Sequence, residues 1–204
     1  MQKIPIAVLV SGSGTNLQAL IDASTHQQYP AEIKLVISNK RSAFGLERAR
    51  QAGIENVWIS HRQRSREDFE HELISTLQEH KIKWVVLAGF MRILTSKFIN
   101  EYPLRVLNIH PSLLPSFPGM NAQQQAWDAG VTVSGATVHF VDAGMDTGPI
   151  IAQKAVSIGS CSSVEEVKEQ ILSAEHQLYP AVIKCAVLNL LSIEAGRVRG
   201  FVPD

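Results

Sequence analysis

The stretch IPIAVLVSGSGTNLQALIDAS, residues 4–24, decides the fold class. Its first seven residues form an unbroken apolar run, typical of a strand buried on both faces of a sheet. The glycine-rich SGSGTN follows, and NLQALIDAS then predicts a helix. A strand, a tight loop and a helix in this order predict the first part of a βαβ unit.

The same alternation continues through the first half of the chain. Further strands are expected at IKLVIS, NVWIS, WVVLAGF and RVLNIH. Helices are expected after Ser42, which could cap a helix running to Gly53, and after Ser65. Right-handed crossovers between such strands predict an α/β fold with a mostly parallel sheet.

The second half has a different pattern. VSGATVHFV and PIIAQKAVSI, separated by the turn-rich DAGMDTG, predict an antiparallel extension, so that the whole sheet is mixed. Ser162 and Ser163 each precede a Glu by three residues, which is a capping-box pattern opening a long C-terminal helix. Pro180 is expected to kink or divide that helix.

Composition limits the classes of function. The chain has 204 residues, with 45% hydrophobic and 19% charged residues and a formal net charge of +0. This balance argues against a general nucleic-acid or membrane-surface role. Cys161 and Cys185 lack a CxxC spacing, and the N-terminal apolar run is too short for a signal or a spanning helix. We therefore expect a reduced, cytoplasmic protein without structural zinc.

The loop SGSGTN is the first candidate site. Glycines permit close approach of a ligand, and free N–H groups at a helix start favour a phosphate. An ordinary capped turn explains the pattern equally well. The loop is neither the dinucleotide fingerprint, because Asn16 stands at its sixth position, nor a Walker loop.

Asn108 and His110 are the second candidate site. In an extended RVLNIH they project from one face near the carboxyl end of a strand, where open α/β sheets bind ligands. An Asn can donate to a developing oxyanion, and a His can exchange a proton near neutral pH. The alternative is a His bonded to a loop carbonyl and an Asn that merely ends the strand.

The loop DAGMDTGP carries Asp142 and Asp146, either of which could orient His110. Calcium binding and a solvated hairpin are the alternatives, although the EF-hand spacing is absent.

Glu175 lies on the apolar stripe of the last helix and could receive a substrate amine or form a helix-edge ion pair. His139 is interpreted as a structural histidine in its strand.

Several segments together resemble the phosphoribosylglycinamide formyltransferases, folate-dependent enzymes of purine synthesis. The segments are SGSGTNLQALIDA, SNKRSAFGLERARQAGI, VVLAGFMRIL, LNIHPSLLPSFPG, GATVHFVDAGMDTGPII and AEHQLYP, and they keep the family's order over nearly the whole chain. The resemblance implies a Rossmann-like, three-layer formyltransferase fold. It also implies one domain over residues 1–204, with a phosphate-binding half at about 1–100 and a folate and catalytic half at about 101–204.

The resemblance assigns site residues by position. It implies a catalytic trio of Asn108, His110 and Asp146, with Asp146 as the partner of His110. It assigns ribonucleotide binding to Gly12, Ser13, Gly14, Thr15, Asn16 and Glu175. It assigns folate binding to Arg66, Met91, Arg92, Ile93, Leu94, Asn108, Asp142, Ala143, Gly144, Met145 and Asp146. Ser116, Asn121, Gln123 and Leu172 depart from many relatives.

The implied reaction moves a formyl group from 10-formyltetrahydrofolate, a co-substrate, to the amine of glycinamide ribonucleotide, without a metal. The expected partners are small molecules, not nucleic acid or membrane, and the expected state is a monomer or weak homodimer. Three other functions stay open: a formyltetrahydrofolate deformylase, a non-catalytic nucleotide-binding module and a nicotinamide-dependent oxidoreductase.

Overall fold

The computed structural model describes residues 2–201, which form two compact units with a boundary between Leu107 and Asn108. The first unit contains strands β1 (Ile4–Val10), β2 (Ala31–Ser38), β3 (Glu55–Trp58) and β4 (Trp84–Leu87), and helices α1 (Thr15–Thr25), α2 (Phe44–Gln51), α3 (Arg66–Glu79) and α4 (Ser96–Glu101). Strand β5 (Val106–His110) crosses the boundary. The second unit contains helices α5 (Ala122–Asp128) and α6 (Val164–Val187) and strands β6 (Val133–Phe140), β7 (Ile150–Ser157), β8 (Ser192–Glu194) and β9 (Arg197–Arg199).

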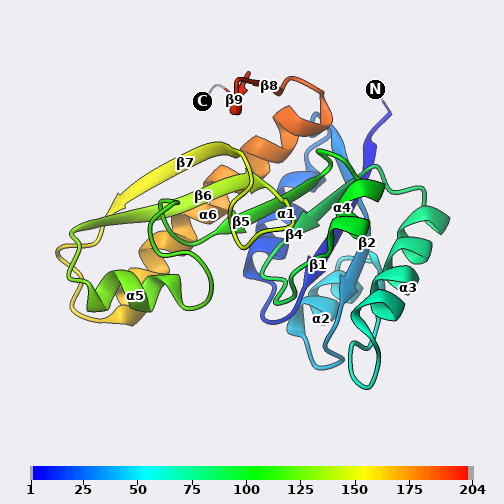
Figure 1. Ribbon diagram of the computed structural model, residues 1–204, viewed down its shortest axis with the longest axis horizontal. Helices are drawn as coiled ribbons and strands as arrows, with labels where there is room; N and C mark the ends of the chain where they lie inside the picture. The colour runs from blue at the N-terminus through cyan, green and yellow to red at the C-terminus, as the bar shows by residue number, and fades with distance from the viewer. Residues whose placement is uncertain (1, 202–204) are drawn as a thin grey trace. The chain divides into compact units, whose positions relative to one another are not determined.

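The first unit is built as the alternating pattern predicts. Strand β1 pairs in parallel with β2 and with β4, and β2 pairs in parallel with β3. Helices α1 and α2 contact each other on one face of these strands, while α3 and α4 contact each other on the other face (Figure 1). All the residues of β1 from Ile6 to Val10 are buried, which agrees with helices on both faces.

The second unit is organised around an antiparallel pair. Strands β6 and β7 pair in antiparallel fashion, and α6 packs against both of them (Figure 1). Helix α5 packs on α6 through a core that includes Ala126, Val167 and Ile171. Because the chain's strand order is β3-β2-β1-β4-β5-β6-β7, the expected mixed α/β sheet with an antiparallel C-terminal extension is confirmed.

One helix end differs from the sequence predictions, and of the two alternatives for Pro180 the division of the helix is excluded. Ser42 does not cap α2; the N-cap is Ala43, which makes no side-chain cap hydrogen bond. Pro180 does not divide α6, which continues through it to Val187. The missing N–H of one proline removes one backbone hydrogen bond, and the buried apolar stripe on both sides of Pro180 is enough to keep the helix continuous.

The expected caps of the two longest helices are present. The Ser65 hydroxyl accepts from the Asp68 N–H at 3.0 Å at the start of α3. The Ser163 hydroxyl accepts from the Glu166 N–H at 3.3 Å, and the Glu166 carboxylate accepts from the Ser162 N–H at 2.7 Å. This is a capping box with its two bonds on adjacent serines.

No helix within residues 2–201 is long and apolar enough to cross a membrane.

Candidate active site

Asn108 and His110 each contact Asp146 within the second unit. Asn108 and His110 come from β5 at alternate positions, so that both side chains leave the same face of the strand. The His110 Nδ1 lies 3.3 Å from Asp146 Oδ2, and the Asn108 amide nitrogen lies 3.5 Å from Asp146 Oδ1. Asp146, and not Asp142, is the aspartate that touches the histidine.

Asp142 instead shapes the loop that presents Asp146. Its Oδ1 accepts from the Gly144 N–H at 3.1 Å and from the Thr147 hydroxyl at 2.8 Å. A Cβ at Gly144 would lie 2.0 Å from that hydroxyl oxygen, so the loop needs a glycine there. Asp146 itself adopts a left-handed backbone conformation, with φ of 56°. This tight turn directs its carboxylate toward β5.

The environment of Asp146 favours the ionised carboxylate. Burial raises its pKa, but the His139 ring, the Gly119 N–H and the charges of His110 and His139 together outweigh burial. The pKa of Asp146 is therefore lowered from its ordinary value of 3.8. The Gly119 N–H donates to Oδ2 at 2.8 Å, so the loop after β5 also holds the carboxylate.

The imidazole of His110 is buried between two oxygens. Its Nε2 lies 2.8 Å from the Phe117 carbonyl oxygen, and its Nδ1 faces Asp146. A carbonyl oxygen only accepts, so Nε2 carries a proton in this contact. His110 therefore presents an N–H donor on the strand face that it shares with Asn108.

His139 belongs to the same cluster, which sequence reasoning missed. The expected structural role is present, because the ring is buried and its Nδ1 donates to the Phe140 carbonyl at 2.8 Å. Its Nε2 lies 3.1 Å from the Asn108 amide nitrogen. His139 therefore orients the Asn108 amide, and its Nε2 also lies 3.7 Å from Asp146 Oδ1. Its position opposite β5 depends on strand pairing and is not visible from local pattern.

The loop SGSGTN joins β1 to α1 in the first unit. Gly14 precedes the helix with φ of 69°, and a Cβ there would lie 2.7 Å from the Gly45 Cα. Helix α2 also holds the loop through the Gly45 N–H to the Gly12 carbonyl at 3.1 Å and Arg48 Nε to the Ser13 carbonyl at 2.9 Å. Gly12 and Ser13 remain exposed at the start of the helix.

The other predicted residues are placed as follows. Glu175 on α6 is buried, with 5% of its surface exposed. Arg66 is exposed at the first position of α3. In the segment after β4, Met91 and Ile93 are exposed while Leu94 is buried, so the Leu94 side chain packs into the core. Ala143 and Met145 are exposed in the Asp142–Asp146 loop. Among the residues described, no group of three or more His, Cys, Asp or Glu side chains could hold a metal ion.

Comparison with known proteins identifies the family. The formyl transferase family model matches residues 4–183. A phosphoribosylglycinamide formyltransferase of Escherichia coli is 45% identical over 179 residues, covering 87% of this chain and 84% of the relative. A trifunctional purine biosynthetic protein adenosine-3 of Drosophila pseudoobscura pseudoobscura is 51% identical over 181 residues, covering 87% of this chain. The chain spans only 13–20% of the length of the trifunctional relatives.

A solved structure agrees with this assignment over nearly its whole length. Glycinamide ribonucleotide transformylase 1 from Symbiobacterium toebii superposes with a TM-score of 0.94 at 45% identity, covering 98% of this chain and 95% of that one. Sequence, order of elements and strand topology therefore lead to the same conclusion: this chain belongs to the formyl transferase family.

Proposed function

We propose that the chain transfers the formyl group of 10-formyltetrahydrofolate to the amine of N1-(5-phospho-D-ribosyl)glycinamide, a step of purine (IMP) synthesis, and that residues 1–204 act as one formyltransferase domain. The observation that carries the proposal is the contact of His110 with Asp146 beside the Asn108 amide. Family membership and the relatives' names support formyl transfer to this acceptor.

The trio suits the charge that acyl transfer develops. When an amine attacks a formyl carbon, the carbonyl oxygen becomes negative. Asn108 and His110 supply two N–H donors for that oxygen, and the Asp146 carboxylate, 3.3 Å from His110 Nδ1, orients the ring. Because Asp146 faces Nδ1, the Nε2–H now held by the Phe117 carbonyl is the His110 donor that the formyl oxygen would take over.

The remaining assignments concern binding. The phosphate is assigned to Gly12, Ser13, Gly14, Thr15 and Asn16, where a helix start offers N–H groups. Glu175 is assigned to the glycinamide end, because a buried carboxylate suits an amine. Folate is assigned, by the family resemblance, to residues around Met91 in the first unit and around Met145 in the second, and these two side chains are 60% and 53% exposed. Bound 10-formyltetrahydrofolate would supply the activated formyl group.

Substitution of the trio tests the proposal. His110→Ala and Asn108→Ala should each lower turnover by roughly 10²- to 10³-fold, because each removes a donor to the developing oxyanion. His71→Ala, an exposed histidine on α3, should leave turnover unchanged and serves as the control. Tetrahydrofolate formation is followed by absorbance, with circular dichroism to check the fold. Turnover near that of the control in either trio variant would contradict the proposal.

A further inference from the structure

A cavity in the first unit is lined by none of the residues assigned above to catalysis, ribonucleotide or folate. It has a volume of about 410 Å³, within the size range of small-molecule sites. Its walls are the loop after β2, with Asn39, Lys40 and Arg41, and the end of β3 with the following residues, including Trp58 and Arg62. Both segments follow the carboxyl ends of parallel strands, the edge where such sheets bind ligands.

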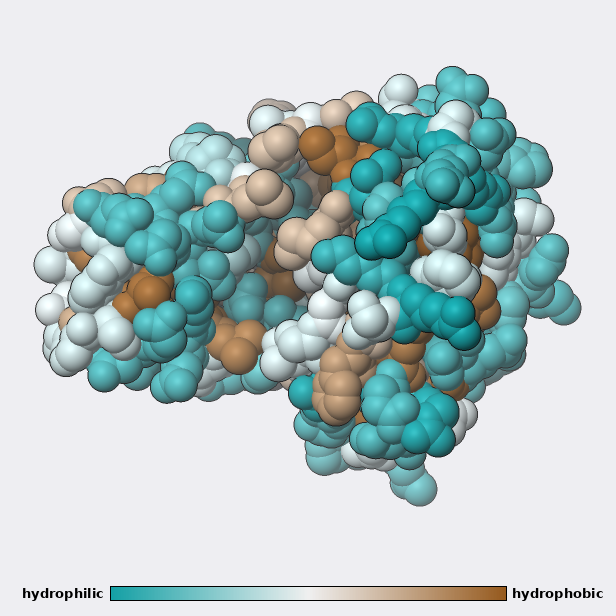
Figure 2. Space-filling model, turned by 90° about the horizontal axis from the view of Figure 1, so that it is seen from below, coloured by the Kyte–Doolittle hydropathy of each residue, from teal (hydrophilic) through white to brown (hydrophobic). Residues whose placement is uncertain are grey.

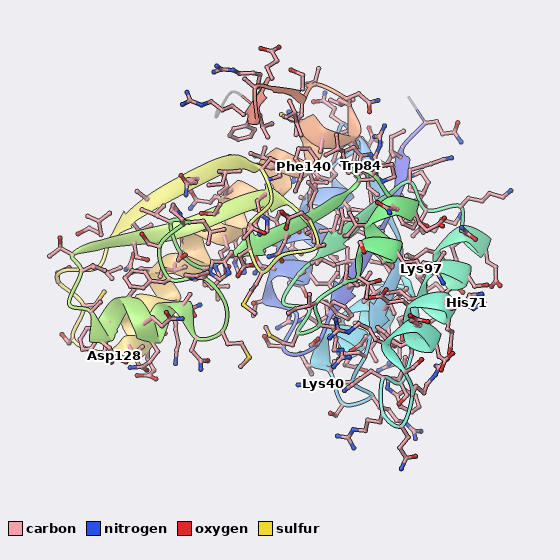
Figure 3. The ribbon with its side chains drawn as sticks, in the orientation of Figure 1. Lys40, His71, Trp84, Lys97, Asp128 and Phe140 are labelled. Atoms are coloured by element: carbon pink, nitrogen blue, oxygen red, sulfur yellow. The ribbon has the colours of Figure 1, made fainter. Side chains whose placement is uncertain are left out.

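The cavity is lined by positively charged side chains, and no acidic side chain in its lining balances their charge. Lys40, Arg41 and Arg62 line it, and none of its lining residues is acidic. Within residues 2–201 no carboxylate lies at ion-pair distance from these three side chains, whereas Arg50 and Arg64 are paired with Glu47 and Glu72. Figure 3 shows Lys40 near α2. Figure 2 views the molecule from below Figure 1, and hydrophilic residues, in teal, cover much of that face. Three unpaired cations around one hollow favour an anionic ligand.

An aromatic ring stands in the same wall. Trp58, the last residue of β3, is 43% exposed, and the Arg41 guanidinium lies 5.6 Å from its ring centroid. An indole this accessible can stack on a planar ring, and guanidinium groups pair with phosphate in a bidentate manner. Ring and cations together therefore suit a ligand that carries both an aromatic base and a phosphate.

The floor of the cavity connects to two segments assigned to substrates. Asn39 is buried, and its Oδ1 accepts from the Ser11 hydroxyl at 2.6 Å. The same Ser11 oxygen accepts from the Met91 N–H at 2.8 Å. Ser11 directly precedes the loop Gly12–Asn16, and Met91 begins the segment assigned to folate. On its other side Asn39 accepts, through its carbonyl, from the His61 ring at 3.0 Å.

We propose that this cavity binds a nucleoside monophosphate, with the base on Trp58 and the phosphate on Lys40 and Arg62. The hydrogen-bonded chain from Asn39 through Ser11 to Met91 connects the cavity to the segments assigned above to the substrates. The proposal does not depend on the formyl-transfer assignment, because binding is measured on the ligand-free protein without turnover.

Calorimetric titration with AMP tests the proposal. AMP should bind more tightly than ribose 5-phosphate or adenosine, each of which lacks one of the two recognised groups. The double variant Lys40→Ala/Arg62→Ala should weaken AMP binding by about tenfold or more, because it removes two phosphate contacts. Trp58→Leu should bring the affinity for AMP down to that for ribose 5-phosphate. Lys83→Ala, an exposed lysine away from the cavity, is the matched control and should bind AMP as the unmodified chain does.

Two results would overturn the proposal. AMP binding that both cavity variants leave unchanged would place the nucleotide elsewhere, for example on the loop Gly12–Asn16. Equal affinity for AMP and ribose 5-phosphate in the unmodified chain would show that Trp58 recognises no base. Thermal unfolding of each variant separates lost binding from lost folding, since Lys40, Arg62 and Trp58 are all exposed.

Discussion

At the scale of single residues, Asp146 joins the polar groups of the second unit. It contacts His110, Asn108 and His139 and accepts from the Gly119 backbone. A half-buried carboxylate with this many polar contacts is stabilised in its ionised form, which is why its pKa falls although desolvation raises it. The same contacts couple the stability of the fold to pH.

Asp146→Asn should lower the free energy of unfolding at neutral pH. The folded state lowers the pKa of Asp146 below 3.8, so its contribution is present above that unfolded value and is lost as the pH falls through the folded pKa. The stability difference between the two proteins should therefore narrow as the pH falls below about 4. Urea unfolding at a series of pH values measures it; a difference that grows on acidification would contradict this prediction.

Residue types and spacing indicated part of this cluster. Asn108 and His110 were predictable together because side chains alternate along a strand. The alternation could not choose between Asp142 and Asp146; the resemblance pointed to Asp146, and the turn geometry directs that carboxylate to His110. His139 was interpreted as structural, because its contact with Asn108 spans 31 residues and depends on how strands pair.

At the scale of elements, two serines that the sequence predicts as helix N-caps differ in the structure. Ser65 caps α3, whereas Ser42 makes no cap bond to α2. Ser65→Ala should therefore destabilise the chain by about 1 kcal/mol, the usual worth of an N-cap. Ser42→Ala, the matched control, should change stability little. Chemical unfolding measures both, and equal losses in the two variants would show that the cap at Ser65 contributes nothing.

Two glycines of the loop between β1 and α1, Gly12 and Gly14, differ in how well they should tolerate an added Cβ. Gly14 has positive φ, and an added Cβ would lie 2.7 Å from the Gly45 backbone, while Gly12 has nothing within 4 Å of an added Cβ. Gly14→Ala should destabilise by at least about 1–2 kcal/mol, since it adds a clash to left-handed strain. Gly12→Ala should leave the melting temperature nearly unchanged. A melting temperature for Gly14→Ala equal to that for Gly12→Ala would refute the expected clash.

The shortest helices and strands cannot be predicted from sequence pattern, for physical reasons. Helices α4 and α5 have six and seven residues, too few for a repeating apolar pattern, and β8 and β9 have three each. The N-cap of α5 is Asn121, which takes a left-handed conformation and makes no side-chain cap bond. Such elements depend on packing against longer neighbours, as α5 does on α6.

At the scale of the whole molecule, the pattern of strands was the most predictable feature. Long apolar strands alternating with helices predicted the parallel pairs, and the turn-rich segment before β7 predicted the antiparallel pair. Contacts between distant segments were not predictable, because nothing local encodes them. The Ser11 hydroxyl bond to Asn39 joins two strand ends that only the parallel register brings together.

The central claim is that this chain passes a formyl group to an amine and not to water. The purified protein is incubated with 10-formyltetrahydrofolate, with and without N1-(5-phospho-D-ribosyl)glycinamide, and release of tetrahydrofolate is followed. Release only in the presence of the ribonucleotide is the predicted result. Equal release without it would mean that the contact of Asn108, His110 and Asp146 serves a deformylase, and no release in either case would contradict a formyl-transfer function.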